Sequence, residues 1–92
     1  MPRWRVYTRP GCTLCEAFIS ELAWLLGPTT AQQVEVVDIS DDDDLERLYG
    51  ARIPVLTADD EIVCTYHVDR EAVLARLAGS AHTAPDRPDI AG

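Results

Sequence analysis

The sequence predicts an α/β domain in which a mixed four-stranded β-sheet is flanked by about three helices. Short alternating runs and longer runs of helical period follow each other in the order strand, helix, strand, helix, hairpin, helix. A strand–helix–strand unit implies a parallel pair with a right-handed crossover, and the hairpin adds an antiparallel pair. With 92 residues, 47% of them apolar, we expect one domain at 1–78 and a flexible tail at 79–92.

The charge and the hydropathy of the chain argue against several kinds of partner. The net charge is −8 at pH 7 and all eight basic residues are arginines, so we expect neither nucleic acid nor an anionic membrane surface. No apolar run is long enough to cross a bilayer, and no signal-peptide core follows the first arginines. We therefore expect a cytoplasmic monomer. In the cytoplasm, neighbouring cysteines serve redox chemistry or metal binding more often than cross-linking.

The first strand and the first helix are predicted from two different spacings of side chains along the sequence. Residues 3–8 alternate between two sides, which indicates a strand, and the Pro10-Gly11 pair ends it. A helix follows and stops at the Gly27-Pro28 pair. Its inward face is formed by six residues at helical spacing: Cys15, Phe18, Ile19, Leu22, Leu25 and Leu26.

Three further features lie in the middle of the chain. Trp24 lies opposite the apolar face of the first helix, where it is either covered by the tail or marks a contact surface. Residues 33–39 are rich in β-branched side chains and predict the second strand. Ser40 is expected to cap a short helix at 41–49, which Gly50 ends. The inner face of that helix is expected to hold Leu45, Leu48 and Tyr49.

The last part of the chain predicts a hairpin and a final helix. Strands are expected at 55–58 and 61–67, with Asp59-Asp60 as the turn between them. Asp69 is placed to cap the final helix. Its inner face is expected to hold Val73, Leu74, Leu77 and Ala78.

Two cysteines, Cys12 and Cys15, stand where the first strand gives way to the first helix. A thiolate is the nucleophilic form of cysteine, and a helix N-terminus can bring a thiol from a pKa of about 8.5 to roughly 3.5–7.5. Cys12 would lie before or at the first turn, and Cys15 about one turn further on, close enough to attack a mixed disulfide on Cys12. The spacing therefore makes this pair a candidate redox motif.

Three features together resemble the glutaredoxin-like proteins of the thioredoxin-fold superfamily, over about residues 3–78. They are the run Tyr-Thr-Arg-Pro-Gly-Cys-Thr-Leu-Cys at 7–15, the Ile53-Pro54 pair before the third strand, and Asp69 at the start of the final helix. The resemblance implies the thioredoxin fold. It also implies a thiol–disulfide oxidoreductase that acts on disulfide-containing proteins or on glutathione mixed disulfides.

The resemblance assigns roles to individual residues of this sequence. It implies that Cys12 attacks the substrate disulfide and that Cys15 resolves the mixed disulfide. Pro54 would be a cis proline facing the motif, and the backbone of Ile53 would pair with the substrate as a short strand. Arg9 would favour the thiolate of Cys12 and a carboxylate on the bound substrate.

The sequence also departs from the glutaredoxin pattern. Thr13 and Leu14, which the resemblance places beside the substrate, replace the usual Pro-Tyr pair between the cysteines. Asp69 is retained and could help to hold the amine of glutathione. However, Tyr66-His67 stands where glutaredoxins have two glycines that allow glutathione to approach closely. We therefore expect no bound cofactor and treat glutathione as a candidate reductant or co-substrate.

Three other functions stay open on the sequence alone. A CxxC/CxxH zinc site could use Cys12, Cys15, Cys64 and His67, but in a strand at 61–67 the last two would point to opposite faces. An iron–sulfur cluster shared between subunits is disfavoured by the second motif cysteine. A non-catalytic binding module on the same fold is the main alternative, because fold does not fix activity.

The remaining chemically reactive side chains have plain structural interpretations. Cys64 is interpreted as a buried strand thiol. His67 is either a surface residue at the end of a strand or a neighbour that tunes Cys12. His82 lies in the tail, without an assigned role. The acidic run at 41–44 is interpreted as a solvated first helical turn, and no metal is expected.

Overall fold

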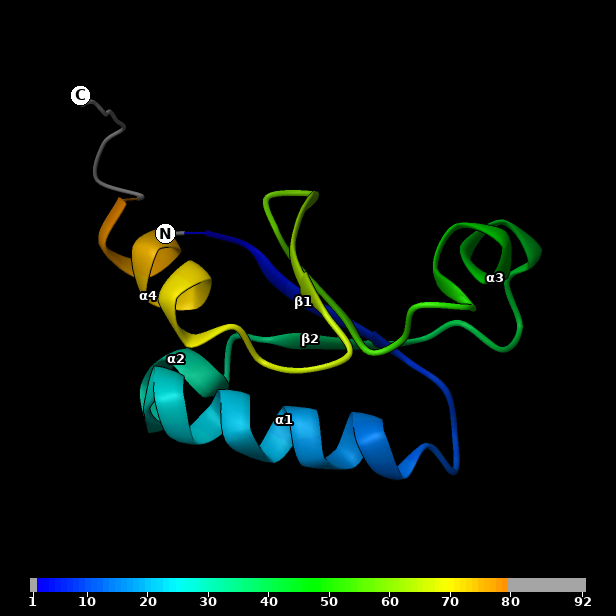
Figure 1. The fold of residues 1–92 in the computed structure, drawn as a ribbon, viewed down its shortest axis with the longest axis horizontal. Helices are drawn as coiled ribbons and strands as arrows, with labels where there is room; N and C mark the ends of the chain where they lie inside the picture. The colour runs from blue at the N-terminus through cyan, green and yellow to red at the C-terminus, as the bar shows by residue number, and fades with distance from the viewer. Residues whose placement is uncertain (1, 80–92) are drawn as a thin grey trace.

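A computed structural model describes residues 2–79 of the chain, and its sheet has the strand order β2-β1-β3-β4 (Figure 1). The elements are β1 (Trp4–Thr8), α1 (Thr13–Leu26), α2 (Pro28–Ala31), β2 (Glu35–Asp38), α3 (Asp43–Tyr49), β3 (Val55–Ala58), β4 (Glu61–Thr65) and α4 (Arg70–Gly79). Strand β1 is parallel to β2 and antiparallel to β3, and β4 is antiparallel to β3. The predicted α/β class and mixed four-stranded sheet are confirmed. The short helix α2 was not predicted; it begins with Pro28, a residue suited to the first turn of a helix.

The strand register brings four connecting segments to one edge of the sheet. Thr8 pairs with Asp38 where β1 and β2 end, Tyr7 pairs with Val55 where β3 begins, and Val55 pairs with Thr65 where β4 ends. The turn after β1, the start of α3, the Ile53-Pro54 pair and the residues after β4 therefore all start from the same edge.

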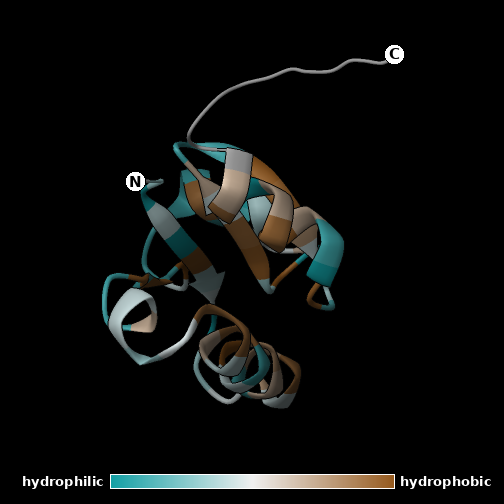
Figure 2. Ribbon diagram, turned by 90° about the vertical axis from the view of Figure 1, so that its left-hand side faces the viewer, coloured by the Kyte–Doolittle hydropathy of each residue, from teal (hydrophilic) through white to brown (hydrophobic). Residues whose placement is uncertain are grey.

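The sheet is covered on both faces by apolar side chains. On one face, α1 and α4 pack over a cluster of buried residues: Trp4, Val6, Phe18, Leu22, Leu26, Leu56, Ala58, Cys64 and Val73. On the other face, α3 contributes Leu45 and Tyr49 to a smaller cluster around Tyr7, Ile39 and Val55. The rings of Tyr7 and Tyr49 stack there with centroids 4.5 Å apart. Figure 2 shows apolar colour on the strands and on the helices that cover them.

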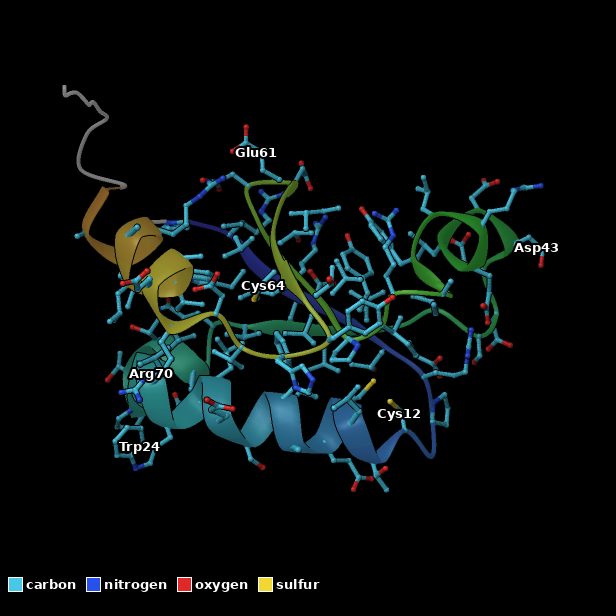
Figure 3. The ribbon with its side chains drawn as sticks, in the orientation of Figure 1. Cys12, Trp24, Asp43, Glu61, Cys64 and Arg70 are labelled. Carbon is cyan, nitrogen blue, oxygen red and sulfur yellow. The ribbon has the colours of Figure 1, made fainter. Side chains whose placement is uncertain are left out.

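Helix α1 confirms the predicted inward face. Cys15, Phe18, Leu22 and Leu26 are buried, and the two other residues of that face pack against the same cluster. Trp24 points away from the sheet with 80% of its surface exposed (Figure 3). The tail that was considered as its cover lies outside the described residues, as does His82.

Helix α3 differs from its prediction at its start and on its inner face. It begins at Asp43, and its N-cap is Asp42, whose Oδ1 accepts the N–H groups of Asp44 and Leu45 at 3.0 and 3.1 Å. Ser40 was the predicted cap, but its N–H and hydroxyl instead donate to Asp38. The helix starts later because Ile39 is buried and bonded to β1 through its N–H, so the chain must first leave the sheet. Gly50 ends the helix as predicted.

Two predicted inward leucines are in fact exposed. Leu48 of α3 and Leu74 of α4 expose 55% and 46% of their surface. Both helices are short and meet the core with residues four positions apart, Leu45 with Tyr49 and Val73 with Leu77, so the neighbouring positions face solvent. Ala78 is also exposed, contrary to prediction.

The hairpin and the final helix cap are confirmed, whereas the predicted length of the last strand is wrong. Asp59 and Asp60 both have positive φ, 52° and 71°, as the two-residue hairpin turn requires. Strand β4 ends at Thr65 instead of continuing to residue 67, because Tyr66 turns into a left-handed conformation with φ 68°. The Asp69 carboxylate accepts the N–H of Ala72 at 3.1 Å and so caps α4.

Candidate functional site

A tight turn delivers Cys12 to the start of α1. The N–H of Cys12 donates to the carbonyl of Arg9 at 3.3 Å, which closes a four-residue turn. Pro10 occupies the second position, and Gly11 occupies the third with φ 76°. Proline and glycine at these positions are typical of a type II turn, whose third residue needs positive φ. The sequence Arg-Pro-Gly-Cys thus specifies how the chain leaves β1 and enters the helix.

Cys12 is the N-cap of α1, and its sulfur accepts a helix hydrogen bond. Its φ and ψ are −86° and 104°, and its Sγ accepts the N–H of Cys15 at 3.1 Å. The carbonyl of Cys12 accepts the N–H of Glu16 at 3.1 Å, so the helix is continuous from this residue. The first N–H groups of a helix have no partner within the helix and favour negative charge. The Sγ of Cys12 therefore lies beside the unpaired N–H groups at the start of α1.

Cys15 lies one turn further on, in a different environment. Only 3% of its surface is exposed, whereas Cys12 is partly exposed. Burial, followed by a hydrogen bond with Cys12, raises the pKa of Cys15 from 9.0 to about 11, although the backbone and the charge of Arg9 act in the opposite direction. Both cysteines are free thiols in this structure. The pair thus combines one accessible sulfur with one buried thiol that keeps its proton at neutral pH.

Arg9, the first residue of the motif turn, is paired with Glu46 of α3. The Nε atom of Arg9 donates to Oε2 of Glu46 at 3.3 Å, and Nη2 donates to Oε1. Both side chains are partly exposed. The guanidinium predicted to serve the thiolate or a substrate carboxylate is therefore shared with a carboxylate of the protein. Glu46 was missed by sequence reasoning because α3 has three acidic residues and nothing in the sequence ranks them.

The Ile53-Pro54 peptide bond is cis, as predicted. Pro54 is buried, and Ile53 is half-buried with its side chain against the smaller apolar cluster. The carbonyl of Pro54 accepts the N–H of Tyr66 at 2.9 Å. Within residues 2–79, neither the N–H nor the C=O of Ile53 takes part in a hydrogen bond. An unpaired backbone pair beside a sheet is suited to pairing with an added strand.

The other predicted site residues have varied positions. Thr13 and Leu14 are exposed in the first turn of α1, next to Cys12. Asp69 caps α4 through its carboxylate, which accepts the N–H of Ala72. The carboxylate of Asp69 is thus committed to the helix start.

Cys64 is the buried strand thiol that was predicted. It lies on β4 (Figure 3), and burial raises the pKa of its thiol. Among residues 2–79, no three His, Cys, Asp or Glu side chains form a group that could hold a metal ion. The four residues of the CxxC/CxxH set are therefore not brought together as a metal site.

No helix in this part of the chain is long and apolar enough to cross a membrane.

The fold and the site define the class of protein. A mixed sheet of order β2-β1-β3-β4, a CxxC pair at the N-terminus of α1 and a cis proline before β3 are those of a thioredoxin-fold protein. The family described as Glutaredoxin-like domain (DUF836) matches residues 5–78, and the chain belongs to this family.

Solved structures support the same assignment. The solution NMR structure of protein Ne2328 from Nitrosomonas europaea is 37% identical, with a TM-score of 0.70, over 80% of this chain and 88% of that chain. The X-ray structure of protein XcR50 from X. campestris is 29% identical, with a TM-score of 0.67, over 89% of this chain and 99% of that chain. No curated protein matches the chain.

Proposed function

We propose that the protein is a thiol–disulfide oxidoreductase with Cys12 as the nucleophile and Cys15 as the resolving cysteine. The observation that carries this proposal is the hydrogen bond from the Cys15 N–H to the Sγ of Cys12 at the start of α1. It places an accessible sulfur in the field of a helix N-terminus, with a buried thiol one turn away. A purely structural cysteine needs neither feature.

The reaction proceeds in two exchange steps. The thiolate of Cys12 attacks one sulfur of a substrate disulfide, a Cys12 mixed disulfide forms, and the other sulfur leaves as a thiolate. Cys15 then gives up its proton, which the departed thiolate takes, and attacks the Sγ of Cys12. The Cys12–Cys15 disulfide forms and the second substrate thiolate leaves, so that two electrons have passed to the substrate. Two glutathione thiols or a reductase would return the pair to the dithiol.

The different environments of the two cysteines suit this order of events. A disulfide on a bulky substrate can reach Cys12 but not Cys15, because Cys15 is buried. The raised pKa of Cys15 keeps it protonated while Cys12 reacts. Ile53, with its unpaired backbone groups, supports a substrate carried on a peptide chain, such as a disulfide-containing protein or a glutathione mixed disulfide.

Intact mass measurement tests this proposal. The protein is equilibrated in graded glutathione redox buffers, quenched with acid and alkylated. We expect a reversible loss of two hydrogens at Cys12 and Cys15, while Cys15→Ser accumulates a mixed disulfide on Cys12. Cys64→Ala serves as the matched control, because it removes a buried thiol outside the motif and should keep the same transition.

Two results would overturn the proposal. One is a Cys12→Ser variant that reduces disulfides as fast as the parent protein. The other is a parent protein whose Cys12 and Cys15 stay reduced and alkylate slowly throughout the buffer series. The second result would favour a binding module built on the same fold.

A further inference from the structure

Tyr66 adopts a backbone conformation that its residue type disfavours. It directly follows β4 and has φ 68°, in the left-handed region that glycine occupies without cost. A tyrosine in this region must be held by its surroundings, and such residues gather at ligand-binding and catalytic sites. The ring is partly exposed, with 44% of the residue surface accessible, so burial of the side chain does not account for the conformation.

The N–H of His67 donates to the carbonyl of Thr65 at 2.7 Å and closes a three-residue turn around Tyr66. Two further hydrogen bonds join Tyr66 itself to residues on both sides of Ile53. The N–H of Tyr66 donates to the carbonyl of Pro54 at 2.9 Å, and its hydroxyl donates to the carbonyl of Ala51 at 2.9 Å. The backbone N–H of Arg52 donates to Tyr49 at 2.7 Å, which ties the same segment to α3. Hydrogen bonds therefore hold the backbone of every residue in the segment 51–54 except Ile53.

This arrangement leaves a prepared pair of backbone groups. Ile53 has no hydrogen bond on its N–H or C=O within the described part of the chain, while its side chain packs against the smaller apolar cluster. The register places this segment at the edge where β1 ends and the motif turn begins, because Tyr7 pairs with Val55. A strand that pairs with Ile53 needs the segment to be held in place beforehand, since ordering it during binding would weaken the complex.

We propose that Tyr66 is a positioning residue that holds the segment 51–54 for substrates whose disulfide is carried on an extended peptide. This inference rests on the proposed function and names a residue that prepares the segment with which a peptide substrate would pair. A peptide has its own N–H and C=O groups beside the cysteine and can use both groups of Ile53. A small disulfide without amide groups cannot, so its reaction with Cys12 should not depend on Tyr66.

The variant Tyr66→Phe tests this inference, because it removes only the hydroxyl that bonds Ala51. Two probes are compared with the reduced protein: a neutral, extended pentapeptide with a central cysteine linked to thionitrobenzoate, and hydroxyethyl thionitrobenzoate disulfide. Cys12 attacks the aliphatic sulfur of either probe, and the thionitrobenzoate thiolate that leaves is followed by its absorbance. The dependence of the rate on probe concentration gives a limiting rate and a half-saturating concentration.

We expect Tyr66→Phe to raise the half-saturating concentration of the peptide probe roughly three- to tenfold, the effect of one lost hydrogen bond on an ordered segment. The limiting rate and the reaction with the hydroxyethyl probe should stay within about twofold of the parent protein. Ser40→Ala is the matched control, because it removes a hydroxyl bond to Asp38 at the same sheet edge without touching 51–54. This variant should react with both probes with the same kinetics as the parent protein.

The outcomes separate the two proposals. In one outcome, the parent protein reacts with both probes while Tyr66→Phe leaves the kinetics of both unchanged, or alters the kinetics of both equally. In that case the positioning role of Tyr66 is wrong and the oxidoreductase proposal stands. If the parent protein reacts with neither probe, the oxidoreductase proposal fails, and the positioning role fails with it.

Discussion

Gly50 is a position where one added methyl group should destabilise the protein, although the backbone alone predicts the opposite. Its φ and ψ are −53° and −35°, a helical conformation that alanine adopts readily. The smaller entropy of the unfolded chain would then favour alanine by about 0.4–1 kcal/mol. However, a Cβ atom at Gly50 would lie 2.5 Å from the carbonyl oxygen of Glu46 and 2.6 Å from its Oε1.

The contact distances decide the sign of this effect. The carbonyl oxygen of Glu46 cannot move away freely, because it accepts the N–H of Gly50 at 2.8 Å in the last turn of α3. The added Cβ would also lie 3.2 Å from Nη2 of Arg9 and so press on the ion pair that joins α3 to the motif turn. Overpacking of this kind costs about 1–3 kcal/mol. Because that cost exceeds the entropic gain, we expect Gly50→Ala to lose about 1–2 kcal/mol of unfolding free energy.

Thermal and urea unfolding of the reduced protein, followed by circular dichroism, measures this loss. For a domain of this size it corresponds to a midpoint lower by about 5–15 °C. The same substitution in a Glu46→Ala background separates the two contacts, because Oε1 is then gone and the carbonyl oxygen remains. Most of the loss should persist there. A Gly50→Ala protein as stable as the parent, or more stable, would refute the reasoning.

Two further predictions concern the cysteines. Cys12→Asp should raise the unfolding free energy by about 0.5–1 kcal/mol while abolishing disulfide exchange, because a carboxylate is a stronger N-cap than a thiol; urea unfolding that shows a less stable variant would contradict this. The pKa of Cys15 is about 11 in the folded protein and 9.0 ordinarily, so its contribution to stability is complete below pH 9 and is lost as the pH rises towards 11. The stability difference between the parent protein and Cys15→Ser should therefore shrink over this range, and a difference independent of pH would disprove the assignment.

The parts of the fold that the sequence predicted well are those that many residues specify together. In α1, six apolar residues repeat at helical spacing, and four of them are buried in the structure. In α3, only seven residues form the helix, so one wrong cap shifts its predicted start and one misplaced leucine changes its predicted inner face. Ser40 and Asp42 are both good cap residues, and the choice between them depends on how far β2 holds the chain to the sheet.

The parts of the site that were missed depend on contacts between distant segments. Cys12 and Cys15 were predicted from their spacing at a strand-to-helix junction, and the cis bond before Pro54 was implied by the resemblance to glutaredoxin-like proteins. The pairing of Arg9 with Glu46 joins residues 37 positions apart and has no local signal. Tyr66 was predicted as part of a strand because its residue type favours strands. In the structure, its bonds to Ala51 and Pro54 and the turn closed between His67 and Thr65 hold it in a left-handed conformation.

Two local rules of protein structure are broken at the same edge of the sheet, and this coincidence supports a functional site there. Cys12 serves as an N-cap although Thr13, a better capping residue, follows it and lies inside the helix. Tyr66 occupies a conformation that glycine would adopt without cost. Neither choice gives the best local stability, and departures of this kind are expected where function constrains the sequence. In the sheet register, Tyr7 pairs with Val55 and Val55 pairs with Thr65. The turn that delivers Cys12 and the segment that Tyr66 holds therefore lie at the same edge of the sheet, and both departures occur at the candidate site.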